Sequence, residues 1–159
     1  MKRIVNWLGQ TMEFEGDLSS AIAKHEITNF PGEYIYEDDL FNVSTDPEIP
    51  INGYMVLGIS KKTLTITDLT KEERNRLTDL SNRLLESMHK SGFEKVMIYQ
   101  DESSSGNLHI NFIPRHEWTY KFHANFGEMG IYAKNNLNIS DEYRKEMLES
   151  IRRIKKNFK

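Results

Sequence analysis

The chain has 159 residues, a mass of 18.7 kDa and a formal charge of −3, which fits one domain without general affinity for nucleic acid or anionic membranes. It has no cysteine, which excludes a disulfide scaffold, a thiolate metal site and a cysteine nucleophile. No apolar run approaches the roughly 18 residues that span a bilayer. We therefore expect a soluble, cytoplasmic, single-domain protein with no membrane or nucleic-acid partner.

The first half of the chain predicts a short helix and three strands. Asp17 is a good cap for a helix over 17–27, and the Pro31-Gly32 turn follows it. β-branched and aromatic residues predict strands at 33–38, 40–45 and 54–59. The near-continuous apolar character of the third indicates that both faces of that strand are covered.

The second half predicts a long helix, two strands and a final helix. Thr70 and Glu73 have capping-box spacing, and an apolar stripe then follows at Leu77, Leu80, Leu84 and Met88. Strands are predicted at 95–100 and 107–113, and Ser140 caps a helix that runs to the C-terminus. The fold class is α+β: an antiparallel sheet of about five strands, one long central helix and a C-terminal helix.

The strand at 107–113 alternates apolar and polar residues. Leu108, Ile110 and Phe112 point to the core, so the opposite face presents Asn107, His109 and Asn111. The preceding loop, SSSG, offers hydroxyls and backbone amides suited to phosphate oxygens. The pattern alone leaves open an ordinary exposed histidine after a serine-rich turn.

The segment NLHINFIPR resembles the signature of the histidine triad (HIT) superfamily, with Asn-x-His-x-Asn in place of the triad. Upstream, YEDDLFNVSTDPEIPINGYMVLGISKK is similar to the family's strands with their ribose-binding aspartate, and TDLTKEERNRLTDLSNRLL resembles its long helix. The likeness covers about Gly32 to Arg115, roughly half of the chain. It implies one HIT-like domain over 1–159, with an N-terminal extension (1–31), a core (32–115) and a C-terminal strand or loop and helix (116–159).

The resemblance assigns roles to three residues. His109 matches the nucleophile that takes the nucleotidyl phosphorus, and a neutral imidazole nitrogen suits this chemistry. Asp46 falls where the family binds the ribose hydroxyls, although a plain cap of the Pro47 turn is the alternative. Ser104 falls where many members carry a serine that contacts phosphate or the leaving group.

Three positions depart from the family. Asn107, Asn111 and Tyr54 stand where it has the other histidines, which orient the nucleophile and help to protonate the leaving group. Asparagine and tyrosine can hydrogen-bond a substrate, but they are poor acid–base groups at neutral pH. His116 or His123, just after the motif strand, is a conceivable replacement acid.

The function implied by the resemblance is a nucleotide hydrolase or nucleotidyl transferase. It would act at the α-phosphate of a dinucleoside polyphosphate or nucleoside phosphoramidate, bind a purine nucleotide, need no metal or cofactor, and form a homodimer. The missing histidines leave a second interpretation open, a catalytically weak or inactive nucleotide-binding regulatory module. A protein-interaction subunit that uses the basic C-terminal helix is a third.

Overall fold

The computed structural model describes residues 1–102 and 106–159. Its centre is a five-stranded antiparallel sheet with the strand order β3–β4–β5–β7–β6. The strands of this sheet are β3 (Tyr36–Glu37), β4 (Phe41–Thr45), β5 (Met55–Ile59), β6 (Val96–Gln100) and β7 (His109–Pro114). A separate antiparallel hairpin precedes it, made of β1 (Lys2–Val5) and β2 (Thr11–Phe14).

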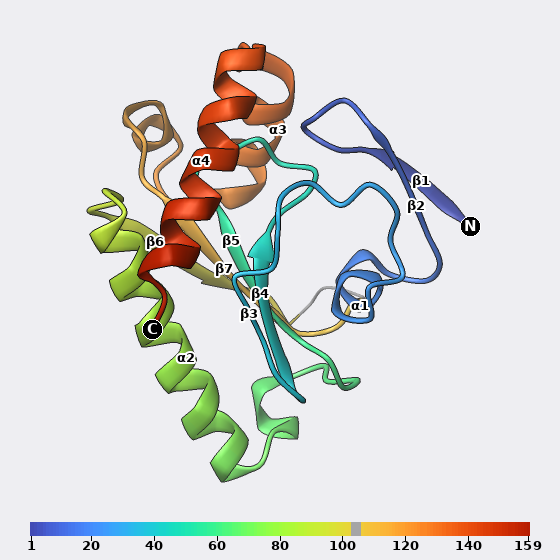
Figure 1. The fold of residues 1–159 in the computed structure, drawn as a ribbon. Coiled ribbons are helices and arrows are strands. Elements are labelled where there is room, and N and C mark those ends of the chain that lie inside the picture. The colour runs from blue at the N-terminus through green and yellow to red at the C-terminus, as the bar shows by residue number, and fades with distance from the viewer. Residues whose placement is uncertain (103–105) are drawn as a thin grey trace.

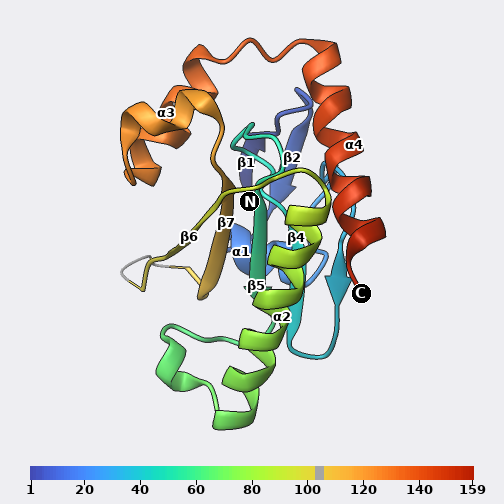
Figure 2. The ribbon, with the colours of Figure 1, turned by 90° about the vertical axis from the view of Figure 1, so that its left-hand side faces the viewer.

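Four α-helices and two short 3-10 helices surround the sheet (Figures 1 and 2). The α-helices are α1 (Leu18–Ala23), α2 (Lys71–Lys90), α3 (Phe126–Asn136) and α4 (Asp141–Asn157). The 3-10 helices are η1 (Ile66–Asp68) and η2 (Glu117–Phe122). Among the described residues, none of the helices is long and apolar enough to cross a membrane.

The inner face of the sheet carries the main hydrophobic core. The helices α2 and α4 pack against each other and bury their apolar stripes on this face, on the other side of the sheet from α1 (Figure 1). The fully buried core side chains contributed by the three central strands are Phe41, Val43, Met55, Leu57, Ile59 and Phe112. Because these strands are packed on one face so completely, their outward-facing residues are held in a fixed frame.

The outer face is covered by two different elements. Near β4 and β5 it lies against α1, whereas α3 and η2 cover the end of the sheet around Tyr54. The ring of Tyr54 meets Phe126 of α3 edge to face, with the ring centroids 5.8 Å apart. The candidate site lies on this outer face, beside α1.

Most predicted elements are confirmed. Asp17, Thr70 and Ser140 each accept a backbone N–H as the caps of α1, α2 and α4, and Thr70 and Glu73 form the predicted capping box. The strand expected at 33–38 is shorter than predicted, because only Tyr36–Glu37 pairs with β4.

Two regions differ from the prediction. The hairpin of β1 and β2 was not predicted, because the first residues carry no clear alternation of apolar and polar side chains. The expectation of a strand or loop after Arg115 is wrong where it names a strand, since η2 and α3 occupy that region. Trp118, Tyr120 and Phe122 alternate in sequence but lie on the 3-10 helix, where i and i+3 share a face instead.

Candidate functional site

The outer face presents two rows of side chains that run across the strands. Register places Asn42 of β4 opposite Gly58 of β5, and Gly58 opposite His109 of β7. One step along, Ser44 lies opposite Val56, and Val56 opposite Asn111. Because Gly58 has no side chain, the amide of Asn42 lies over it, in the row between Asn42 and His109.

A cavity of about 210 Å³ lies over these rows. Its floor comes from β4, β5 and β7, and its wall from the first residues of α1. The lining residues are Leu18, Ser19, Ile22, Asn42, Ser44, Asp46, Pro47, Val56, Gly58 and His109. The N-terminal extension therefore builds part of the site, through α1.

His109 has a defined tautomer. Its Nδ1 lies 2.9 Å from the carbonyl oxygen of Asn107, which can only accept a hydrogen bond. Nδ1 therefore carries the proton in the neutral ring, and Nε2 keeps its lone pair. The Ser19 hydroxyl lies 3.4 Å from the same Nδ1, so α1 contacts the imidazole on the side away from Nε2. Both contacts are made to Nδ1, and Nε2 makes no hydrogen bond to a described residue.

Asp46 caps the turn after Pro47, as the sequence allowed, and it also lines the cavity. Its Oδ1 accepts the N–H groups of Glu48 and Ile49 at 2.8 and 2.7 Å, which caps the turn after Pro47. The residue also lines the cavity, and no hydrogen bond to its other oxygen, Oδ2, is made by any described residue. Burial raises the pKa of this carboxyl to about 6. Oδ2 is thus an available acceptor at the opposite end of the cavity floor from His109.

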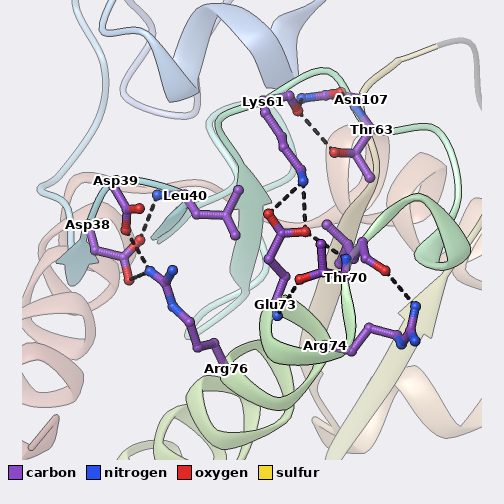
Figure 3. A network of polar contacts seen from close by, with 11 residues as sticks. Asp38, Asp39, Leu40, Lys61, Thr63, Thr70, Glu73, Arg74, Arg76 and Asn107 are labelled. Carbon is purple, nitrogen blue, oxygen red and sulfur yellow. Dashed lines mark hydrogen bonds and ion pairs between the residues drawn. The ribbon is translucent and has the colours of Figure 1, made fainter.

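Asn107 holds a loop together and does not enter this cavity. Its Oδ1 accepts the N–H of Thr63 at 2.7 Å, and its Nδ2 donates to the carbonyl oxygens of Ile59 at 2.7 Å and Lys61 at 2.8 Å. Figure 3 shows Lys61 of the same loop extending to Glu73 at the start of α2, with Nζ–Oε distances of 2.6 and 2.7 Å. The amide therefore connects the beginning of β7 to the loop that docks on the long helix.

Asn111 and Tyr54 bind each other. The Tyr54 hydroxyl donates to Asn111 Oδ1 at 2.7 Å, and the Asn111 Nδ2 donates to the carbonyl oxygen of Tyr99 at 3.3 Å. Both residues are buried. Burial, followed by the negative charge of Asp46, raises the pKa of Tyr54 well above its usual value. The phenol therefore keeps its proton and acts as a hydrogen-bond donor to Asn111.

The structure thus separates the predicted site residues. His109 and Asp46 line one cavity, whereas Asn107, Asn111 and Tyr54 are absent from its lining. Ser104 lies outside the described residues. His116 sits beyond the far end of β7, where its Nε2 is 2.8 Å from the Asn52 carbonyl oxygen.

His123 does not line the cavity either, and its carbonyl oxygen instead accepts a hydrogen bond from Arg115. Neither proposed replacement acid is therefore near His109. Within the ranges that the structure describes, no group of three or more His, Asp or Glu side chains is arranged to hold a metal ion.

Sequence reasoning missed the cavity residues that come from α1 and β4. Ser19 belongs to a helix that was predicted, but nothing in the sequence indicated that this helix would lie against His109. Asn42 and Ser44 alternate with Phe41 and Val43, so their positions on the polar face could have been predicted from the period of two. That polar pattern in an otherwise buried strand was the available signal.

Comparison with known proteins identifies the fold. No protein-family model matches the chain, and no curated protein matches it in sequence. Among solved structures, the chain is similar to a HIT-like protein involved in cell-cycle regulation from Bartonella henselae, solved with an unknown ligand. The two share 18% identity over 91% of this chain and 98% of the other, with a TM-score of 0.59.

Two further structures agree with this likeness. A hypothetical histidine triad nucleotide-binding protein from Sulfolobus tokodaii is 15% identical over 89% of this chain and 93% of its own, with a TM-score of 0.61. A zinc-bound histidine triad family protein from Mycobacterium smegmatis is 16% identical over 84% and 91%, with a TM-score of 0.54. The chain therefore has the HIT-like fold that its motifs predicted, in a divergent sequence.

Proposed function

We propose that this protein binds a purine nucleotide in the cavity between α1 and the sheet and transfers its nucleotidyl group to His109. The observation that carries the proposal is the tautomer of His109. With Nδ1 bonded to the Asn107 carbonyl, Nε2 has no hydrogen bond to any described residue, and His109 lines a cavity that also contains the Asp46 carboxylate. The HIT-like neighbours support the same ligand class, since one of them is described as nucleotide-binding.

The reaction has two steps. In the first, Nε2 of His109 attacks the α-phosphorus, an N–P bond forms, and the P–O or P–N bond to the leaving group breaks. The leaving group takes a proton from solvent. In the second, water attacks the same phosphorus and gives a proton to solvent, the N–P bond breaks, and the nucleoside monophosphate leaves while the imidazole returns to its neutral form. Another nucleophile in place of water would make the protein a nucleotidyl transferase.

The size of the cavity indicates which part of a nucleotide it would hold. Its volume of about 210 Å³ is below the roughly 300 Å³ at which pockets for whole drug-sized ligands begin. We therefore place the base and ribose inside, with the ribose hydroxyls donating to Asp46. The α-phosphate would lie at the rim beside His109.

A neighbouring cavity supports a phosphate-rich leaving group. It has a volume of about 220 Å³, and its charged lining residues are Asp17 and two exposed lysines, Lys24 and Lys62, which leave a net positive charge. Positive charge at this place suits the polyphosphate of a dinucleoside polyphosphate. Substrates of that kind are therefore our first choice.

The test is turnover by wild type and by His109→Ala. Both proteins are incubated with adenosine and guanosine dinucleoside polyphosphates and phosphoramidates, and products are resolved by mass. We expect nucleoside monophosphate from wild type alone, while His109→Ala still binds nucleotide within a few-fold. Equal turnover by the two proteins would refute the assignment of the nucleophile.

A second candidate function is a nucleotide-binding regulatory module with little or no turnover. The engagement of Asn107 and Asn111 in hydrogen bonds within the protein favours it, because neither flank of His109 offers a proton to a leaving group. Tight binding by wild type without product from any substrate of the panel would support this module over the enzyme.

We also propose a cytoplasmic homodimer. The strand β6 is an edge of the sheet, and its Ile98 is 52% exposed. Pairing of two β6 strands would bury this side chain and extend the sheet. Sedimentation equilibrium of wild type and Ile98→Lys tests it, with a monomeric variant as the expected result.

A further inference from the structure

Asn42 is a buried polar residue whose side-chain amide nitrogen lacks a hydrogen-bond partner among the described residues. It is 3% exposed, and its Nδ2 has no hydrogen bond to any described residue. An unpaired buried donor is costly, and in native proteins such groups call for a specific explanation. Asn42 lines the same cavity as His109, which makes a ligand the natural partner.

The neighbouring residue Gly58 gives Asn42 its space. A Cβ at position 58 would lie 2.9 Å from Oδ1 and 3.1 Å from Nδ2 of Asn42. Contacts this short are too close for a methyl group, so any larger residue at 58 would displace the amide. Gly58 therefore keeps room for the Asn42 side chain.

The amide of Asn42 is also free to turn. No hydrogen bond to a described residue fixes it, and the terminal torsion of asparagine is broad. Because Nδ2 is buried in the structure, a half-turn of the amide, which exchanges Nδ2 with Oδ1, would turn it to face a ligand. Ser44, two residues further along β4, adds a hydroxyl to the same floor. The cavity floor therefore carries an amide and a hydroxyl, polar groups that a purely hydrophobic pocket would not need.

We infer that Asn42 is a specificity-determining residue, whose amide hydrogen-bonds the polar edge of the nucleobase held in this cavity. The inference rests on the proposed function and narrows its ligand class to nucleotides with a hydrogen-bonding base. The ribose and phosphate are bound elsewhere, by Asp46 and around His109. Asn42 therefore contributes affinity only to ligands that carry a base.

The experiment compares a nucleotide with its sugar phosphate. AMP, GMP and ribose 5-phosphate are titrated into wild type and Asn42→Leu, with binding followed by NMR or calorimetry. We expect Asn42→Leu to bind at least one of the two nucleotides about tenfold or more weakly, the effect of losing one buried hydrogen bond. Its affinity for ribose 5-phosphate should stay within twofold of wild type. Asn42→Ala, a smaller variant, should show the same selective loss.

Thermal unfolding separates recognition from structure. Removal of an unpaired polar group should leave the melting temperature of Asn42→Leu unchanged or higher. Unchanged nucleotide affinity in both variants would overturn the inference alone, and so would an equal loss for all three ligands with a lower melting temperature. Failure of wild type to bind any nucleotide would instead overturn the proposed function, and the inference with it.

Discussion

Two buried asparagines, Asn42 on β4 and Asn107 just before β7, differ in one respect. Asn107 and Asn42 are 6% and 3% exposed, and only β5 separates β4 from β7. Asn107 makes three hydrogen bonds to the backbone of one loop, whereas the Nδ2 of Asn42 makes none within the described chain. The first amide stabilises the fold, and the second is available to a ligand.

The same contrast, between side chains bound within the protein and side chains open to a ligand, applies to the Asn-x-His-x-Asn motif. At Asn107 and Asn111 the side chains serve the protein itself, through the loop at 59–63 and through Tyr54. Of the three residues of the Asn-x-His-x-Asn motif, His109 is the one that lines the cavity, and its Nε2 makes no hydrogen bond to a described residue. Under the proposed function, His109 would attack without a neighbouring acid among the described residues, so the properties of the leaving group would be decisive.

The largest expected effect follows from that missing acid. General acid catalysis is typically worth about 100- to 10,000-fold, so substrates whose leaving group needs a proton should be poor. We expect kcat/KM for a nucleotidyl p-nitrophenyl ester to exceed that for an alkylamine phosphoramidate of the same nucleotide by about 100-fold or more. Similar values would mean that a proton donor reaches the leaving group, against the structural roles given to Asn107 and Asn111.

A large loss of stability is expected for Asn107→Ala. The change leaves the Thr63 N–H and the carbonyl oxygens of Ile59 and Lys61 without their partner, at about 1–3 kcal/mol for each buried group. We expect the free energy of unfolding in urea to fall by about 3 kcal/mol. Asn42→Ala is the matched control and should change it by about 1 kcal/mol at most. Equal losses for the two variants would remove the distinction between these asparagines.

Nucleotide affinity should depend on the ionisation of Asp46. Its pKa is raised to about 6, so the carboxylate gains a proton as the pH falls from 7 to 5 and accepts the ribose hydroxyls less strongly. Affinity for a dinucleoside polyphosphate, whose own charge is steady in this range, should fall several-fold. For the ligand-free protein, the raised pKa changes folding stability in the opposite direction. The protonated carboxyl stabilises the folded state below about pH 4, and this contribution is lost as the pH rises through 6.

Asp46→Asn provides the control for this pH effect. The amide keeps an acceptor but cannot ionise, so the variant should bind weakly at all pH values and lose the part of the pH dependence that Asp46 causes. A pH profile identical to that of wild type would show that a group other than Asp46 is responsible.

The smallest expected effect is at Tyr54. Replacement by phenylalanine removes the hydroxyl that donates to Asn111 Oδ1 and leaves this buried oxygen unpaired, at about 1–2 kcal/mol of unfolding free energy. Turnover per folded molecule should not change, because Tyr54 does not line the cavity. A loss of kcat without a loss of stability would instead give Tyr54 a part in the reaction.

Much of the fold could be predicted from local patterns. The capping box at Thr70 and the apolar stripe of α2 act within one helix, so they are visible in the sequence. The period of two in β7 likewise gave both of its faces. By contrast, α3 begins at Asn125 with few apolar residues in a regular stripe, and its place depends on packing over Tyr54, which is a tertiary contact.

The candidate site was less predictable than the fold. His109 and Asp46 were found because motifs carry them, but the partners of Asn107 and Asn111 come from segments 12 to 57 residues away in sequence. Only the folded structure shows that the Asn42 Nδ2 has no hydrogen-bond partner among the described residues. Such contacts follow from strand register and cannot be deduced from composition or spacing.

The central claim is that His109 forms a bond to the substrate's phosphorus. Intact-protein mass spectrometry after rapid mixing of wild type with a nucleotidyl p-nitrophenyl ester, followed by an alkaline quench that preserves phosphoramidates, tests it most directly. The account predicts a mass increase of one nucleotidyl group, located on the peptide that contains His109 and absent from His109→Ala. Product formation without any such adduct, or an adduct that persists in His109→Ala, would contradict it.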